Sequence, residues 1–346
     1  MRLAQIVVIA LTVVAQADVI RSSFADATGT AERPAASVAW IKNGKTEFAH
    51  FGHKTLPDGP APANDTVYEI GSISKTFTGI LLADMILNKE VTLETTIGEL
   101  LPGKNYSADA RKIALLALAT HSSGLPRLPN NMMAATKDPM NPYAYYTTDD
   151  LDAYLRTYTA AGADPQPEYS NLGVGLLGYA LSTKAGKSYE QLITERVLAL
   201  LGMRDTSITL SESQKSRLAP GHAGGKVVPN WDVPTLAGAG ALRSTAADMI
   251  KYLHAVLEPP DTRLGRAIRM AREPRADLAP GARIGFAWIT RKTDDGRDLT
   301  WHNGGTGGYR SFIGMIPDAK VGIVVLTNAN SNPDPIAIRA LTALAR

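Results

Sequence analysis

Apolar and polar residues alternate near both ends of the chain, which is the pattern of strands. Residues 36–42 alternate in this way, Asn43-Gly44 then forms a two-residue turn, and residues 45–52 continue as a second strand. Four further strands are predicted near the C-terminus, over residues 284–291, 298–302, 310–316 and 320–327. Both ends of the chain therefore contribute strands.

Between these strands the spacing of apolar residues is helical. Residues 72–88 carry apolar side chains at helical intervals, and a long stretch over about 90–270 mixes helical patterns with loops rich in Pro and Gly. A last helix is expected over about 334–345. Strands from both ends with helices between them predict an α+β fold, with one antiparallel sheet, flanking helices and a mostly helical insertion.

We expect this fold to form two lobes within one domain over residues 18–346. The α/β lobe takes residues from about 30–75 and 270–346, and the helical lobe covers about 76–269. A cleft between two such lobes is the expected place for a functional site.

The N-terminal residues have the pattern of an export signal. Arg2 provides positive charge at the start, and residues 6–15 form a short apolar run. The small residues Ala15 and Ala17, of the kind that precede a signal-peptidase cleavage site, lie at the end of this segment. A membrane span needs about 18–20 apolar residues, so this run is too short for one. We therefore expect residues 1–17 to be a signal peptide cleaved after Ala17, and the mature protein to be periplasmic or secreted without stable membrane insertion.

Composition narrows the possible chemistry. Hydrophobic residues make up 45% of the 346 residues and charged ones 20%, as in an ordinary globular protein. The chain has 0 Cys, which excludes thiolate nucleophiles, disulfides and Cys-based zinc sites. The 36 basic residues nearly balance the 33 acidic ones, and the sequence has no dense run of basic residues. The charge pattern therefore does not indicate binding to nucleic acid.

One S-x-x-K motif, Ser72-Ile73-Ser74-Lys75, opens the first expected helix. Its spacing places the Lys75 amine and the Ser72 hydroxyl on one helical face, in a first turn whose free N–H groups favour negative charge. A Ser nucleophile needs a neighbouring base, and Lys becomes one when burial or a second cation lowers its pKa. The alternative is a helix-capping Ser beside a solvated Lys.

Two further segments carry candidate chemistry. In Tyr169-Ser170-Asn171, the Tyr hydroxyl could relay a proton and the Asn amide could hold a carbonyl; the alternative is a packed Tyr beside a capping Asn. The segment Trp301-His302-Asn303-Gly304-Gly305-Thr306-Gly307-Gly308 joins two expected strands. Its small residues allow the backbone to approach a ligand closely, although a flexible hairpin tip has the same composition.

Together, these segments resemble the class C β-lactamases and their penicillin-binding relatives. The resemblance runs through residues 68–79, through Leu118-Ala119-Thr120-His121-Ser122-Ser123-Gly124-Leu125-Pro126, through the Tyr169 segment, through residues 236–248 and through the His302 segment. It covers nearly the whole mature chain. Tyr68 stands where the family usually has Phe.

The resemblance implies a role for each matching residue. Ser72 would attack the substrate carbonyl and become acylated, while Lys75 and Tyr169 would move the proton and later help to activate water. Asn171 would bind the side-chain amide of the substrate. The backbone N–H groups of Ser72 and Gly305 would form the oxyanion hole.

Two departures from the family pattern concern the substrate. His302, Asn303 and Gly304 stand where the β-lactamases usually have Lys-Thr-Gly, and His there is familiar in related D-alanyl-D-alanine carboxypeptidases and esterases. If His302 binds a substrate carboxylate as a cation, the KM of anionic substrates should rise between about pH 6 and 8. The Gln expected after Gly-Leu-Pro is also missing, with Arg127, Leu128, Asn130 and Asn131 nearby.

These observations lead us to expect a class C-like serine hydrolase that opens β-lactam amide bonds, a function associated with antibiotic resistance. It would use no metal and no cofactor, take a small-molecule substrate and act as a monomer. A D-alanyl-D-alanine carboxypeptidase or small-ester esterase with the same site is the first alternative. A non-catalytic penicillin binder is the second.

Overall fold

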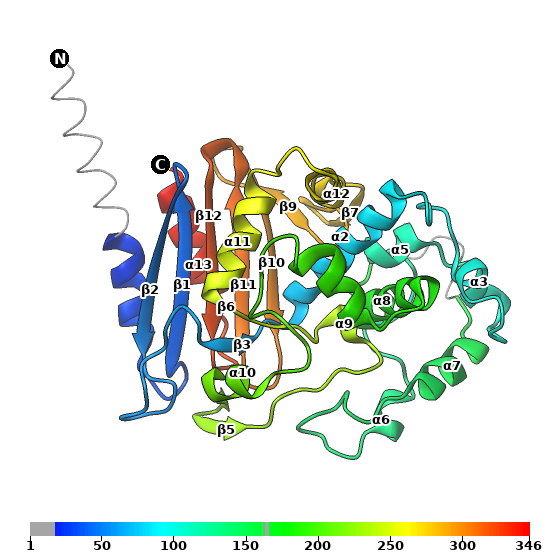
Figure 1. Cartoon of the computed structure of the whole chain (residues 1–346), viewed down its shortest axis with the longest axis horizontal. Helices are drawn as coiled ribbons and strands as arrows, with labels where there is room; N and C mark the ends of the chain where they lie inside the picture. Colours follow the sequence, from blue (N-terminus) through cyan, green and yellow to red (C-terminus); the bar gives the residue numbers. More distant parts are fainter. Residues whose placement is uncertain (1–17, 161, 163–165) are drawn as a thin grey trace.

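The computed structural model describes residues 18–160, 162 and 166–346, and the expected signal peptide lies outside them. One large sheet of eight strands dominates the fold, in the order β2-β1-β12-β11-β10-β9-β8-β7 (Figure 1). Every neighbouring pair in it is antiparallel. The strands are β1 (Ala35–Lys42), β2 (Lys45–Gly52), β7 (Ala276–Ala279), β8 (Ala282–Ile284), β9 (Ile289–Lys292), β10 (Asp298–Gly305), β11 (Arg310–Ile316) and β12 (Val321–Thr327).

Both ends of the chain meet in this sheet, as the alternation predicts. In the β1–β2 hairpin Lys42 pairs with Lys45, and Asn43 and Gly44 both have positive φ, as a tight two-residue turn requires. β1 then pairs along its length with β12. The α+β class and the antiparallel sheet built from the two chain ends are therefore confirmed.

One predicted strand is wrong in its extent. The segment expected as a single strand over residues 284–291 is divided into β8 and β9. A Cβ atom at Gly285 would lie 2.5 Å from the carbonyl oxygen of Ala271, Phe286 N–H donates to that same oxygen, and Ala287 has φ 65°. The break therefore follows from contact with the preceding helix, α12 (Arg263–Arg272).

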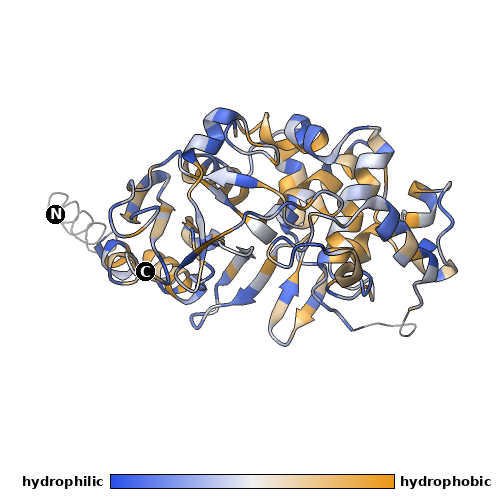
Figure 2. Cartoon of the chain, turned by 90° about the horizontal axis from the view of Figure 1, so that it is seen from below, coloured by the Kyte–Doolittle hydropathy of each residue, from blue (hydrophilic) through white to orange (hydrophobic). Residues whose placement is uncertain are grey.

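Helices cover both faces of the sheet. On one face α13 (Asp334–Leu344) and the helical residues 18–26 pack on alternate strand residues such as Val38 and Trp40. On the other face, α11 (Ala246–Leu257) crosses β1 and β12 and joins the larger core (Figure 1). In that larger core, hydrophobic positions gather in the helices beside the sheet (Figure 2).

The remaining elements lie mostly in the middle of the chain, as expected. Two short strand pairs also occur there: β3 with β6, and β4 with β5. Within the described residues no helix has the length and apolar character to span a bilayer. The division into two lobes stays a prediction. The remaining bounds are β3 (Val67–Glu69), η1 (Gly71–Ile73), α2 (Ser74–Leu87), α3 (Ile97–Leu100), α4 (Ala108–Arg111), α5 (Leu115–Ala119), α6 (Met132–Ala135), α7 (Thr148–Thr157), α8 (Asn171–Ala185), α9 (Tyr189–Ile193), η2 (Thr194–Leu198), α10 (Glu212–Arg217), β4 (Gly221–Ala223), β5 (Lys226–Val228), η3 (Ala237–Ala239), β6 (Arg243–Thr245) and η4 (Pro317–Ala319).

Candidate active site

Ser72 lies where the loop after β3 becomes helical. It is the middle residue of η1, which continues directly into α2. Gly71 has φ 49°, and a Cβ atom there would lie 2.5 Å from the Gly305 nitrogen. At Gly304, a Cβ atom would lie 2.0 Å from the Ile70 carbonyl oxygen. These glycines therefore allow the end of β10 to lie against the start of the helix, with the Gly305 backbone beside Ser72.

Lys75 is fully buried one helical turn after Ser72. Its Nζ atom lies 2.9 Å from Ser72 Oγ and donates a hydrogen bond of 2.6 Å to the Ala239 carbonyl. Burial, with a smaller effect of the Arg127 charge, holds the pKa of Lys75 well below its usual value. The amine is therefore deprotonated more readily than an ordinary Lys and can accept the Ser72 proton.

Tyr169 lies beside both residues on the loop before α8. Lys75 Nζ is 5.0 Å from the centre of its ring, and Arg127 Cζ is 5.2 Å from it. Burial raises the pKa of Tyr169 to about 12, against smaller opposing effects of a hydrogen bond with Ser72 and the Arg127 charge. Tyr169 is therefore a neutral phenol near pH 7, able to donate a proton.

His121 holds the Tyr169 loop in place. Its backbone oxygen accepts from Glu168 N–H at 2.9 Å, its Nδ1 accepts from Ser170 N–H at 3.1 Å, and its ring lies 4.5 Å from that of Tyr169. Since Nδ1 accepts, the ring proton is on Nε2, which is buried without a hydrogen-bond partner. Burial, with help from nearby positive groups, lowers the pKa of His121 well below its usual value.

His302 is also buried, which bears on the role expected for it as a titrating cation. Its side chain lies 2.6 Å from the Asn303 carbonyl through Nδ1, so Nδ1 carries the proton and Nε2 is a free acceptor. Burial, and secondarily Lys75, lowers the pKa of His302 to about 3. The ring is therefore neutral between pH 6 and 8 and carries no charge for a substrate carboxylate.

Asn171 begins α8 and faces the same space. Its amide nitrogen donates to the Tyr143 hydroxyl at 3.0 Å, whereas its buried Oδ1 has no partner and can accept an N–H group. Asn303 is exposed and donates from its amide to Asp334 at 2.5 Å. Thus Asn171 offers a free acceptor, while the Asn303 amide nitrogen is already bonded.

Most of the candidate residues border one cavity, although Lys75 and His302 do not line it. A cavity of about 660 Å³ contains Ser72, Tyr169, Asn171, Asn303, Gly304 and Gly305 in its wall. A narrower recess also touches Ser72, Asn171 and Gly305. A cavity of similar volume, about 690 Å³, lies against α10 and contains none of these residues.

Sequence reasoning identified most of this wall but missed several residues. Of the residues near the missing Gln, Arg127 and Leu128 lie in the cavity wall, whereas the Asn131 amide donates to the Asp150 carbonyl at 2.8 Å. Arg310 is in the wall and carries no motif signal. The position of His121 in the Thr120-His121-Ser122 segment was the one available signal for its role. Among the described residues no group of three or more His, Asp or Glu side chains is arranged so that it could bind a metal ion.

Comparison with known proteins agrees with this geometry. A family model described as Beta-lactamase matches residues 20–346. The D-alanyl-D-alanine-carboxypeptidase/endopeptidase AmpH of Escherichia coli is 29% identical over 304 residues, which cover 83% of this chain and 77% of that protein. A beta-lactamase of Escherichia coli is 28% identical over 344 residues, covering 89% and 87%. A beta-lactamase of Pseudomonas fluorescens is 26% identical, covering 89% and 92%.

The family model spans nearly the whole chain, and the relatives align over most of their own lengths. Together they confirm the family that the motifs around Ser72, Tyr169 and His302 predict. The chain belongs to the β-lactamase family, and its function is that of a β-lactamase-type serine hydrolase.

Proposed function

We propose that the chain is a class C-like enzyme that opens β-lactam amide bonds through an acyl-enzyme on Ser72. The observation that carries this proposal is the Lys75 amine, buried and 2.9 Å from Ser72 Oγ. A hydroxyl is a weak nucleophile unless a base within hydrogen-bond reach takes its proton. The lowered pKa of Lys75 makes it that base.

In acylation, Ser72 Oγ attacks the substrate carbonyl carbon while its proton passes to the neutral Lys75 amine. The negative oxygen that forms is stabilised by the backbone N–H groups of Ser72 and Gly305. The C–N bond then breaks, and the departing nitrogen takes the phenolic proton of Tyr169. The Lys75 ammonium returns a proton to Tyr169, which leaves both groups neutral.

In deacylation, a water molecule attacks the Ser72 ester and gives a proton to Lys75. The ester C–O bond breaks, and Lys75 returns that proton to Ser72 Oγ. Asn171 Oδ1, which has no partner within the described structure, accepts an N–H bond from the amide side chain of the substrate. The steps need no metal and no cofactor.

Mass spectrometry of the purified protein with benzylpenicillin tests this proposal. An adduct on Ser72 should form and then decay as the product is released. Ser72→Ala should give no adduct, whereas Ser213→Ala, an exposed serine on α10, should behave as the wild type. Undiminished turnover of a chromogenic cephalosporin by Ser72→Ala would refute the assignment.

The same site supports a second candidate, a D-alanyl-D-alanine carboxypeptidase or a small-ester esterase. Two observations favour it: the neutral His302 in place of the usual Lys, and the 29% identity to AmpH, which is named a carboxypeptidase/endopeptidase. Values of kcat/KM for a cephalosporin, p-nitrophenyl acetate and a D-Ala-D-Ala peptide rank the activities. A stable adduct without turnover would instead indicate a penicillin binder.

We also propose that the protein is exported and works as a periplasmic or secreted monomer. Support comes from the pattern of residues 1–17, with its basic start, short apolar run and small residues before the expected cleavage site. N-terminal sequencing of protein recovered from the periplasm should begin at Asp18. Recovery of uncleaved protein in the cytoplasm alone would contradict this, and size-exclusion chromatography tests the monomer.

A further inference from the structure

The cavity beside Ser72 needs a cation if it is to hold an anionic substrate, and His302 does not supply one. The pKa of His302 is lowered to about 3. Lys75 is committed to Ser72 and to the Ala239 carbonyl. Neither residue lines the cavity, and the basic side chains among the described residues of its wall are Arg127 and Arg310.

Both arginines and Tyr169 lie in the wall of the wider cavity and not in that of the narrow recess. The narrow recess beside Ser72 has no charged residue in its wall, which consists of Ser72, Tyr143, Asn171, Trp231, Val233, Ala239, Gly240, Gly305 and Thr306. The wider cavity adds Tyr169, Arg127 and Arg310. In the proposed mechanism Tyr169 protonates the departing nitrogen, so the departing part of the substrate lies in the wider cavity, whose wall also holds the two arginines.

Arg310 is held so that part of its guanidinium stays available. It begins β11, and its Nη1 donates to the carbonyls of Thr306 at 2.9 Å and of Tyr309 at 3.1 Å. A Cβ atom on Gly305 would lie 2.5 Å from that Nη1, so the head group packs against the strand end beside Ser72. In the described part of the chain Nε and Nη2 make no hydrogen bond. Two donors of a fixed fork are therefore free to bind a carboxylate.

The charge of Arg310 is only partly balanced by protein groups. Asp334 is the acid whose charge acts on it, but no ion pair within 4.0 Å joins the two among the described residues. The Asp334 carboxylate instead accepts from the Asn303 amide at 2.5 Å. Arg310 is partly buried, so an unpaired charge there attracts an anion more strongly than one in open solvent.

Arg127 has a different position. It is exposed, and its guanidinium stacks on the ring of Tyr169. Its charge also lowers the pKa of Lys75 and of Tyr169, although burial is the larger influence on both. Arg127 therefore acts on the proton-transfer residues, whatever the charge of the substrate.

We propose that Arg310 is the residue that binds the carboxylate on the leaving-group portion of the substrate, so that the site prefers acyl compounds whose departing part is anionic. This inference rests on the proposed acyl-enzyme function. Arg310 is a substrate-binding residue in this proposal, and the free Nε and Nη2 atoms are its donors.

Benzylpenicillin and its neutral methyl ester give a matched test, since they differ only in the carboxylate. Arg310→Ala should lower kcat/KM for the acid about 10- to 100-fold, mainly through KM, and change it for the ester by less than about 2-fold. Arg310→Lys should restore part of the loss. Arg266→Ala, which removes an exposed arginine on α12, should leave both substrates unaffected.

Calorimetry on the Ser72→Ala background separates this proposal from the acylation step, because binding is then measured without chemistry. The acid should bind more tightly than the ester, and Arg310→Ala should remove that preference. Equal loss for acid and ester, or a preference that survives Arg310→Ala, overturns the carboxylate role even if the enzyme is active. If the wild type gives no Ser72 adduct, the acyl-enzyme mechanism is refuted. The calorimetry then still decides whether Arg310 binds the carboxylate.

Discussion

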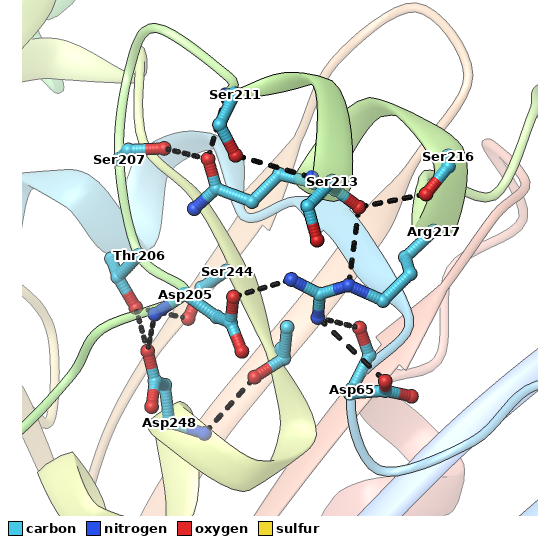
Figure 3. A network of polar contacts seen from close by, with 12 residues as sticks. Asp65, Asp205, Thr206, Ser207, Ser211, Ser213, Ser216, Arg217, Ser244 and Asp248 are labelled. Carbon is cyan, nitrogen blue, oxygen red and sulfur yellow. Dashed lines mark hydrogen bonds and ion pairs between the residues drawn. The ribbon is translucent and has the colours of Figure 1, made fainter.

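Two polar regions of the molecule differ in how far their groups are satisfied. The first, which we call the Asp248 network, joins α10, α11 and the segment before α10 (Figure 3). Asp248 Oδ2 accepts from Asp205 N–H at 2.7 Å and from the Thr206 hydroxyl at 3.0 Å, and its Oδ1 accepts from Lys251 at 2.8 Å. Arg217 bonds to Asp205 at 2.5 Å, and this contact raises the pKa of Arg217.

The second region, the catalytic cluster, consists of Ser72, Lys75, His121, Tyr169 and His302. Here two imidazole Nε2 atoms are buried without partners. Burial shifts the pKa values of Lys75, His121 and His302 downward, towards their neutral forms.

The comparison shows that the polar groups with a full set of hydrogen bonds are structural, whereas the groups suited to catalysis lack some of their partners. In the Asp248 network the polar groups are bonded to one another, so they hold the structure together and have few free donors or acceptors. Ser244 of β6 is bonded to Thr206, and β6 pairs with β3, the strand that leads to Ser72. The fully hydrogen-bonded Asp248 network thus supports β3, the strand that positions the catalytic cluster, whose groups lack partners.

The largest expected effect comes from exchanging one lysine in each region for Met. Lys75→Met should lower the rate of Ser72 acylation about 10³-fold, because the general base is lost. Lys251→Met, which removes a partly exposed partner of Asp248, should keep near wild-type acylation. Stopped-flow measurement with a chromogenic cephalosporin checks both, and equal losses would remove the distinction between the regions.

The next effect is on stability. Asp248→Ala should lower the free energy of unfolding by about 1–3 kcal/mol, since it leaves the partly buried Asp205 N–H without its acceptor and removes one of the two partners of the buried Thr206 hydroxyl. The folded fraction should still acylate Ser72. Urea unfolding followed by circular dichroism gives the free energy, and an unchanged midpoint would contradict the structural role.

The next effect, stated per unit of pH, also concerns stability. An unfolded His binds a proton near pH 6.5, but buried His302 does so only near 3, so the unfolded state binds more protons between these values. His302 should therefore make stability fall by about 1.4 kcal/mol for each unit that the pH drops within that window. His121 acts in the same direction.

The control for this pH effect is His302→Asn, whose stability should depend less steeply on pH between 6.5 and 3. Thermal unfolding in a series of buffers measures the slope. A slope identical to that of the wild type would mean that His302 has the same pKa in the folded protein as in the unfolded chain.

The smallest effect concerns Arg127. Arg127→Ala should lower kcat/KM about 3- to 10-fold, and equally for benzylpenicillin and its methyl ester, because the residue acts on Tyr169 and Lys75. Its pH–rate profile should also move to higher pH. A loss confined to the acid would instead make Arg127 a carboxylate-binding residue.

Local patterns allowed much of the fold to be predicted. The β1–β2 hairpin depends on alternation and on Asn43-Gly44, and the Ser72–Lys75 pair depends on helical spacing, all of which lie within a few residues. The division of residues 284–291 depends instead on the Ala271 carbonyl of another element. That contact leaves no trace in the alternation.

The site was predictable in its residue types but not in its charges. The order of the motifs identified Ser72, Tyr169 and His302, and the glycines beside Gly305 suggested a close approach of the backbone. The neutral state of His302 follows from tertiary burial, and the position of Arg310 follows from the pairing of β10 with β11. Neither the charge state of His302 nor the position of Arg310 can be predicted from neighbouring residues in the sequence.

The protonation state of Lys75 is the central claim, and it can be measured directly by NMR titration of protein labelled with ¹³C at the lysine Cε atoms. The Lys75 signal is assigned as the one that Lys75→Arg removes. We predict that it titrates well below 10.5, so that the free amine is available to Ser72. Titration at or above 10.5 would mean that Lys75 stays an ammonium and cannot take the proton of the nucleophile.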